Sequence, residues 1–183
     1  MRRRPAGLLV PLLLAATVGW AFAPGLDGAF LWDDRRSIVE NPHVRHLGWT
    51  TLTRTSRPLV QLTFALDHAR AGLDPRPYHH VNLGLHALAT LALYAFVRRA
   101  LMRAGLQGAS PGGAAWSAGA VAALWAVHPL QTESVTYVVQ RSEVLAGLFI
   151  VLALYCLDRA ASDRKSTRLN SSHSRASRMP SSA

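Results

Sequence analysis

Four long apolar runs divide the sequence and decide which folds are open to it. They cover about residues 7–23, 79–97, 114–130 and 138–157, and the first contains no charged residue. A membrane core takes roughly 20 apolar residues of helix, so each run approaches the length of a span. Charged residues make up 16% of the chain, below the roughly 25% of soluble domains. The predicted fold is therefore an all-α, polytopic bundle of membrane helices over residues 1–163.

Basic clusters between the apolar runs predict the orientation of the spans. They stand before the first run, after the second and after the fourth, at Arg2–Arg4, Arg98–Arg103 and Arg159–Lys165. Because cytoplasmic loops carry an excess of Lys and Arg, four spans place these clusters and the N-terminus in the cytoplasm. We expect an integral membrane protein. The same parity puts loop 24–78 and segment 128–143 together on the extracytoplasmic face.

The segments outside the spans are expected to hold short helices or no fixed structure. The long first loop, residues 24–78, includes Leu59–Ala69, which is compatible with a short amphipathic helix on the membrane surface. Loops of this length are often functional. Residues 164–183 are rich in serine and contain no Asp or Glu, so this tail is predicted to be disordered. Its abrupt change of composition indicates a non-native extension.

The basic charge of the chain does not indicate a nucleic-acid-binding protein. The formal net charge is +10, but the basic residues flank apolar runs and form no stripe with aromatic residues. Cys156 is the only cysteine, so an internal disulfide and a cysteine-rich metal site are excluded. The expected partners are membrane lipids and not nucleic acids.

Two short motifs in the first loop are candidates for chemistry. Asp33 and Asp34 form an acidic pair, in which one carboxylate can act as a general base while its neighbour tunes it or binds a cation. The alternative is a pair of solvated acids facing the adjacent arginines. Pro58 restrains Arg57 toward an extended backbone, and a fixed guanidinium is a good partner for phosphate. The alternative for Arg57 is a contact with lipid head groups.

Polar residues at the ends of the other runs form a second set of candidates. His79, Asn82 and His86 share one face of a helix by their spacing. Ionisable groups in membrane helices are functional candidates by default, which adds His128, Glu133, Arg141 and Glu143. The alternatives are hydrogen bonds between helices and a salt bridge from Arg141 to Glu133 or Glu143. No metal site is encoded clearly, so the cofactor is unknown and a divalent cation stays open.

Six motifs, taken in order, resemble one known family. They are Phe30–Asp34, Asn41-Pro42, Arg57–Phe64, Tyr78–His86, His128–Val135 and Arg141–Ala146. This series resembles the membrane part of the transmembrane-and-TPR O-mannosyltransferases and their bacterial relatives, which have the GT-C architecture. The resemblance covers about residues 5–160 and implies a protein of a bacterial inner membrane. Members of the family have more spans and commonly carry TPR repeats, whereas this sequence contains no 34-residue repeat.

The resemblance implies a function and a set of roles. Such enzymes transfer a sugar, here expected to be mannose-like, from a polyprenyl-phosphate carrier to a hydroxyl of a protein or glycan on the outer face. Asp33 or Asp34 would be the base and Arg57 would hold the carrier phosphate. The cavity would be lined by His79, Asn82, His128, Glu133, Arg141 and Glu143. The alternative is a non-enzymatic membrane scaffold or assembly protein, in which the polar clusters serve helix packing.

Overall fold

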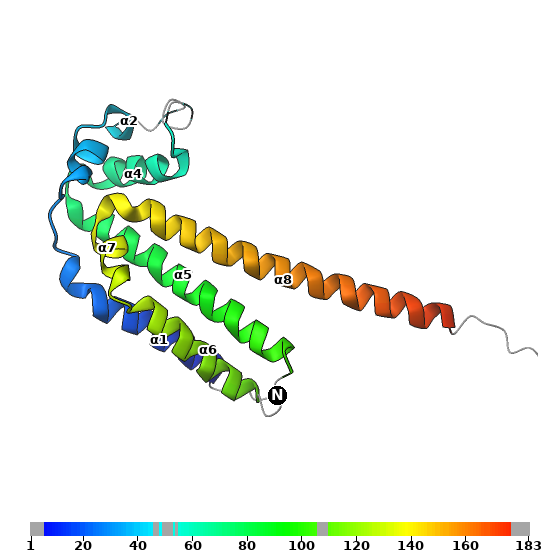
Figure 1. Cartoon of the computed structure of the whole chain (residues 1–183). Helices are drawn as coiled ribbons and strands as arrows, with labels where there is room; N and C mark the ends of the chain where they lie inside the picture. Colours follow the sequence, from blue (N-terminus) through cyan, green and yellow to red (C-terminus); the bar gives the residue numbers. More distant parts are fainter. Residues whose placement is uncertain (1–5, 46–47, 49–52, 54, 106–109, 177–183) are drawn as a thin grey trace, which may run out of the picture.

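Four long helices lie side by side and run in alternating directions in the computed structural model (Figure 1). They are α1 (Ala6–Phe22), α5 (Pro75–Arg103), α6 (Pro111–Ala126) and α8 (Arg141–Ala176). The structure describes residues 6–45, 48, 53, 55–105 and 110–176. No strand occurs among these residues, so the all-α prediction is confirmed for them.

Short elements gather at one end of the bundle, where α1 and α6 end and α5 and α8 begin (Figure 1). The loop after α1 contains η1 (Ala23–Gly25), the π-helix η2 (Arg35–Val39), α2 (Pro42–Arg45) and α4 (Pro58–Ala71). Between α6 and α8 lie α7 (Leu130–Thr136) and η3 (Val138–Gln140). The expected helix over Leu59–Ala69 is therefore present, as the central part of α4.

Within the part of the chain that the structure describes, three helical segments are long and apolar enough to cross a membrane. They are Gly7–Gly25, Pro75–Arg103 and Val138–Ser162. The expected third span, residues 114–130, is a helix of 16 residues that ends at Ala126. Pro129 begins a separate short segment, because its ring interrupts helical hydrogen bonding. The bundle contains four long helices in antiparallel order, but three of them, and not the predicted four, are candidate membrane spans among the described residues.

Small residues let α6 approach α1 closely. The buried face of α6 consists of Ala114, Ala115, Ala118, Gly119, Ala122 and Ala126. A Cβ atom added at Gly119 would lie 2.6 Å from Cγ1 of Val10 on α1, so only glycine fits there without movement. Small residues at helix contacts are typical of membrane bundles, where close packing replaces the hydrophobic effect.

The other end of the bundle is joined by charged side chains. Arg99 and Arg103 at the end of α5 both contact the carboxylate of Asp158 on α8, and Arg99 also donates to Oγ of Ser162 at 2.9 Å. Arg99 and Arg103 belong to one of the basic clusters that the sequence assigns to one side of the membrane, and Asp158 directly precedes the cluster Arg159–Lys165. The structure brings those two clusters to the same end.

The predicted disorder of residues 164–183 is not confirmed for its first part. Helix α8 continues to Ala176 (Figure 1), and residues 177–183 lie outside the described residues. Neither glycine nor proline occurs between Arg164 and Ala176. A helix that is already formed extends at low cost through such a sequence, because only its nucleation is unfavourable.

Candidate functional site

Two segments far apart in the sequence meet at the end of the bundle that holds the short elements. The backbone N–H of Asp33 donates to the Tyr137 hydroxyl at 2.9 Å. The backbone N–H of Val139 donates to Oδ1 of Asp34 at 2.7 Å. The first loop and the segment between α6 and α8 therefore form one site. The sequence predicts that these two segments lie on the same face of the membrane, and the structure brings them together at one end of the bundle.

The two aspartates of the acidic pair have different surroundings. Asp34 is 1% exposed, and its Oδ2 accepts the backbone N–H of Leu31 at 3.0 Å. Burial raises the pKa of the Asp34 carboxyl above its ordinary value, and the N–H bonds from Leu31 and Val139 act in the opposite direction. Asp33 is exposed. Only Asp33 is thus free to contact a substrate, whereas Asp34 is committed to internal hydrogen bonds.

Asp33 faces a cavity of about 660 Å³, which we call the acidic cavity. Its second carboxylate is Glu133 of α7, which is also exposed. The remaining lining residues are Leu31, Trp32, Pro129, Thr132, Thr136 and Tyr137. Two carboxylates and an aromatic ring in one open cavity are suited to bind and deprotonate a hydroxylated ligand.

A second cavity, of about 390 Å³, lies between α4 and α8, and we call it the arginine groove. Arg57 precedes α4, and its Nη1 donates to Oγ of Ser142 at 2.8 Å. The rest of the groove is lined by Pro58, Leu59, Val60, Glu143, Leu145, Ala146 and Phe149. A guanidinium at one side of an apolar groove fits an amphiphile with an anionic head and a hydrocarbon chain.

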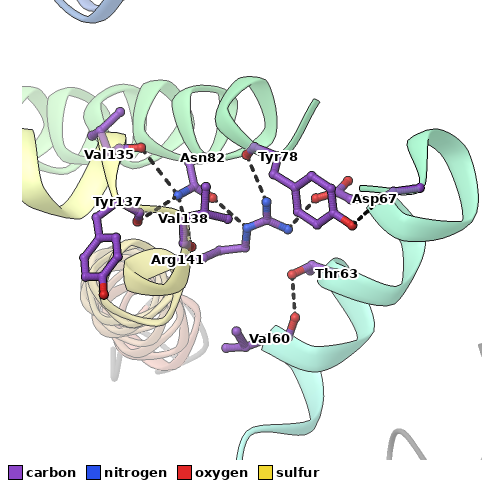
Figure 2. A network of polar contacts seen from close by, with 10 residues as sticks. Val60, Thr63, Asp67, Tyr78, Asn82, Val135, Tyr137, Val138 and Arg141 are labelled. Atoms are coloured by element: carbon purple, nitrogen blue, oxygen red, sulfur yellow. Dashed lines mark hydrogen bonds and ion pairs between the residues drawn. The ribbon is translucent and has the colours of Figure 1, made fainter. Parts of the chain in front are cut away.

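Arg141 is the centre of a buried polar network between α4, α5 and α8 (Figure 2). Its guanidinium donates to Oδ1 of Asn82 at 2.6 Å, to Oδ2 of Asp67 at 2.7 Å and to the carbonyl of Tyr78 at 2.9 Å. The same guanidinium lies 4.6 Å from the centre of the Phe64 ring. Arg141 is 0% exposed, so every face of it is used inside the protein.

The expected salt bridge from Arg141 to Glu133 or Glu143 is wrong. Its carboxylate partner is Asp67 of α4, and both glutamates are exposed. The preference for Asp67 has a physical reason, because a buried guanidinium needs a partner that is buried with it. The sequence offered one signal for Asp67, an acid on a short apolar helix, three positions after Phe64.

The histidines are placed in two different ways. His79 and His86 are buried on the same face of α5 as Asn82, which confirms the predicted shared face. The ring Nε2 of His79 is 3.0 Å from the carbonyl of Gly28, and that of His86 is 3.0 Å from the carbonyl of Ala126. These bonds connect α5 to the start of the first loop and to the end of α6.

His128 is exposed where α6 ends. Its Nδ1 accepts the backbone N–H of Leu130 at 3.3 Å, which caps the start of α7. Within the described residues no three His, Cys, Asp or Glu side chains are grouped so as to hold a metal ion.

The predicted site residues other than His128, which lines neither cavity, therefore separate into three places. Asp33 and Glu133 share the acidic cavity, and Arg57 and Glu143 share the arginine groove. The buried set consists of Asp34, His79, Asn82 and Arg141. Residues 137–142 connect the two cavities along the chain, since Tyr137 lines one and Ser142 lines the other.

Comparison with known proteins gives the family context of this site. The chain is 34% identical over 180 residues to the human protein O-mannosyl-transferase TMTC1, which covers 87% of this chain and 19% of that protein. Its relatives are protein O-mannosyl-transferases. The mouse protein O-mannosyl-transferase TMTC2 is 33% identical over 173 residues, covering 85% of this chain and 19% of the relative. The human protein O-mannosyl-transferase TMTC4 is 32% identical over 180 residues, which cover 83% of this chain and 24% of that protein.

These protein O-mannosyl-transferases support the family resemblance carried by the six motifs. The chain spans about a fifth of the length of these three relatives. No family model and no solved structure matches it.

Proposed function

We propose that this chain belongs to the O-mannosyltransferase family of its relatives and forms part of a membrane glycosyltransferase with the GT-C architecture. The reaction is transfer of a mannose-like sugar from a polyprenyl-phosphate carrier to a hydroxyl of a protein or glycan. The observation that carries this proposal is the acidic cavity, in which an exposed Asp33 stands beside Glu133. The relatives, which are named protein O-mannosyl-transferases, support the reaction class.

Asp33 is the general base of the proposed reaction. Its carboxylate takes the proton of the acceptor hydroxyl while the hydroxyl oxygen bonds to C1 of the sugar. The bond from C1 to the carrier phosphate breaks on the opposite face, and the carrier leaves with the bonding electrons as a phosphate monoester. An inverting transfer of this kind needs one carboxylate base opposite the leaving group. Asp34 does not take this role, because its two oxygens already accept backbone N–H groups.

The arginine groove is the proposed place of the carrier. Arg57 lies at the groove and its guanidinium can pair with the phosphate, with Ser142 as an adjacent hydroxyl. Leu59, Leu145 and Phe149 line the groove with apolar surface suited to a polyprenyl chain. The groove therefore combines a positive charge for the phosphate with an apolar surface for the hydrocarbon chain.

The site faces the extracytoplasmic side in this proposal, with the N-terminus in the cytoplasm. The support is the basic cluster after the second apolar run, because a long loop such as residues 24–78 crosses a membrane largely regardless of its charge. Arg98, Arg99 and Arg103 stand at the end of α5 remote from the cavities, where the positive-inside rule expects basic residues on the cytoplasmic side.

A scaffold without activity is the second candidate, and one observation favours it for part of the polar residues. The buried network of Arg141, Asp67 and Asn82 serves packing between helices. Asp33 and Glu133 have no such role, because both are exposed at a cavity.

The decisive experiment replaces Asp33 in membranes that contain the protein. Asp33→Asn is expected to abolish sugar transfer from a mannosyl-phosphoryl-polyprenol donor, with membrane abundance unchanged. Asp27→Asn is the matched control, since Asp27 is an exposed acid of the same loop that pairs with Arg76 outside the cavity. Equal transfer by the Asp33→Asn variant and the unmodified protein would remove Asp33 from catalysis and favour the scaffold.

A further inference from the structure

Trp32 has an unusual backbone conformation beside the proposed base. Its φ angle is +40°, and no other non-glycine residue in the described part of the chain has a positive φ. A bulky side chain in this region is an outlier, because its Cβ crowds the following carbonyl group. The side chain of Trp32 is nevertheless 86% exposed, so burial of the indole does not offset the strain.

Hydrogen bonds on both sides hold the turn that contains Trp32. The backbone N–H of Asp34 donates to the carbonyl of Leu31 at 2.8 Å, and the carboxylate of Asp34 accepts the N–H of Leu31 at 3.0 Å. The N–H of Asp33 is fixed by the Tyr137 hydroxyl. A strained residue persists only where its surroundings determine it fully, and such residues cluster at binding and active sites. Here the result is an indole that lines the acidic cavity.

The lining of the acidic cavity matches the chemistry of a sugar ring. A pyranose has an apolar C–H face and a rim of hydroxyl groups. The indole of Trp32 offers an apolar, electron-rich surface to the C–H face of the sugar. The carboxylate of Glu133 offers hydrogen-bond acceptors to the sugar hydroxyls. Trp32 and Asp33 are adjacent, so a ring on the indole lies next to the proposed base.

We propose that Trp32 stacks against the pyranose ring of the transferred sugar and that Glu133 accepts hydrogen bonds from its hydroxyls. This inference rests on the proposed function and assigns the sugar subsite within it. An anchor in the membrane interface is the other role open to an exposed tryptophan. The pocket favours the sugar, because an interfacial anchor gains nothing from two neighbouring carboxylates or from a strained backbone.

Trp20 provides a matched comparison within the same chain. It is 81% exposed, nearly as much as Trp32, but it lies on α1 and does not line the acidic cavity. The chain is labelled with 5-fluorotryptophan, reconstituted in lipid nanodiscs and titrated with methyl α-D-mannopyranoside. The ¹⁹F resonances of Trp32 and Trp20 are assigned with the Trp32→Phe and Trp20→Phe variants.

The expected result is a saturable shift of the Trp32 resonance with the Trp20 resonance unchanged. Glu133→Gln is expected to raise the dissociation constant of the mannoside about three- to tenfold, which corresponds to the loss of one charge-assisted hydrogen bond. An unchanged Trp32 resonance, or equal shifts of both resonances, would overturn the sugar subsite and leave Trp32 as an interfacial residue.

Transfer kinetics give a second, independent readout. Trp32→Leu keeps an apolar side chain without an aromatic face, and it is expected to lower kcat/KM about three- to tenfold. Trp32→Phe should restore most of that loss, and Trp20→Leu should cause none. Full activity of Trp32→Leu would contradict the proposal.

The two proposals fail in different ways. If Asp33→Asn abolishes transfer and the mannoside leaves the Trp32 resonance unchanged, only the proposed sugar subsite is contradicted. If Asp33→Asn transfers normally and the Trp32 resonance still shifts, the proposed catalytic role falls and the cavity remains a sugar-binding site.

Discussion

The backbone N–H of Val139 lies 2.7 Å from Oδ1 of Asp34, across 105 positions of sequence. This bond joins the loop after α1 to η3, which directly precedes α8. Together with the N–H of Leu31 it uses both oxygens of the Asp34 carboxylate. The adjacent Asp33 is left exposed at the acidic cavity. The two adjacent acids thus differ in their surroundings: Asp34 is held by internal hydrogen bonds, and Asp33, the proposed base, is exposed at the cavity.

The buried carboxylate of Asp34 predicts a defined pH dependence of stability. Burial raises its pKa in the folded state, so the folded state binds more protons than the unfolded state just above the ordinary pKa of an aspartate. The contribution of Asp34 to the free energy of unfolding is therefore most favourable below that range and falls as pH rises through the folded pKa. Above both pKa values the cost of the buried charge is constant.

Asp34→Asn removes this titration, so the stability of the variant should depend less on pH than that of the unmodified protein. The measurement is the Tm of the detergent-solubilised protein between about pH 4 and pH 7, near the acidic pKa range. The difference in Tm between the unmodified protein and Asp34→Asn should become less favourable to the unmodified protein as pH rises. Asp27→Asn is the control, because Asp27 is an exposed acid. A constant difference across this range would contradict the prediction.

The ion pair between Arg141 and Asp67 predicts a strong coupling between two mutations. Arg141→Met leaves the Asp67 carboxylate buried without its partner, and we expect a loss of about 3–5 kcal/mol in the free energy of unfolding. Asp67→Leu combined with Arg141→Met removes both charges and should recover most of that loss. The measurement is reversible unfolding of the purified protein, analysed as a double-mutant cycle.

A surface pair in the same protein is the control for this cycle. Arg76 and Asp27 are 3.1 Å apart with side chains that are 66% and 79% exposed. Arg76→Met should change the free energy of unfolding by no more than about 0.5 kcal/mol, because exposed ion pairs are screened by solvent. Similar losses for Arg76→Met and Arg141→Met would show that the buried pair has no special structural role.

The close contact of α6 with α1 predicts an unequal response of two glycines. Gly119→Ala places a methyl group 2.6 Å from Val10, and we expect a loss of about 1–3 kcal/mol from overpacking. Gly147→Ala is the control, because no atom outside its own helix lies within 4 Å of the added Cβ. Adding Val10→Ala to Gly119→Ala should recover part of the loss. The measurement is thermal unfolding in detergent of the unmodified protein, the two glycine variants and the double variant.

The sequence predicts the helices well, because hydropathy and length act locally. The apolar runs after Gly7 and before Arg98 are helices in the structure. The third run gives a shorter helix than expected, since Pro129 and the residues before it end α6 at Ala126. The boundaries thus depend on single residues, while the presence of each helix depends on the whole run.

The site could be predicted only in part. The acidic pair is recognisable in the sequence as a motif. Which of the two acids is buried depends on the hydrogen bond from Val139 to Asp34, a contact between distant parts of the sequence. The partner of Arg141 could not be read from nearby acids, because Asp67 approaches from a different helix. Spacing therefore selects residue types, and long-range packing decides which of them stay free to react.

Arg57 is expected to act on carrier binding more than on the chemical step. Arg57→Gln removes the charge at the arginine groove, and we expect KM for the polyprenyl-phosphate sugar to rise about tenfold or more with a smaller change in kcat. Arg57→Lys keeps the charge but loses the planar fork, so it should restore only part of the affinity. The KM and kcat of each variant are measured in membranes with varied donor concentration.

A second arginine of the same loop separates this effect from a general loss of positive charge. Arg45 is exposed and donates to the carbonyl of Val39 at 2.8 Å, and it does not line the arginine groove. Arg45→Gln should therefore leave both KM and kcat close to those of the unmodified protein. A fall in kcat with unchanged KM for Arg57→Gln would place Arg57 at the reacting centre and not at the carrier, because only a group that acts in the transition state lowers kcat alone.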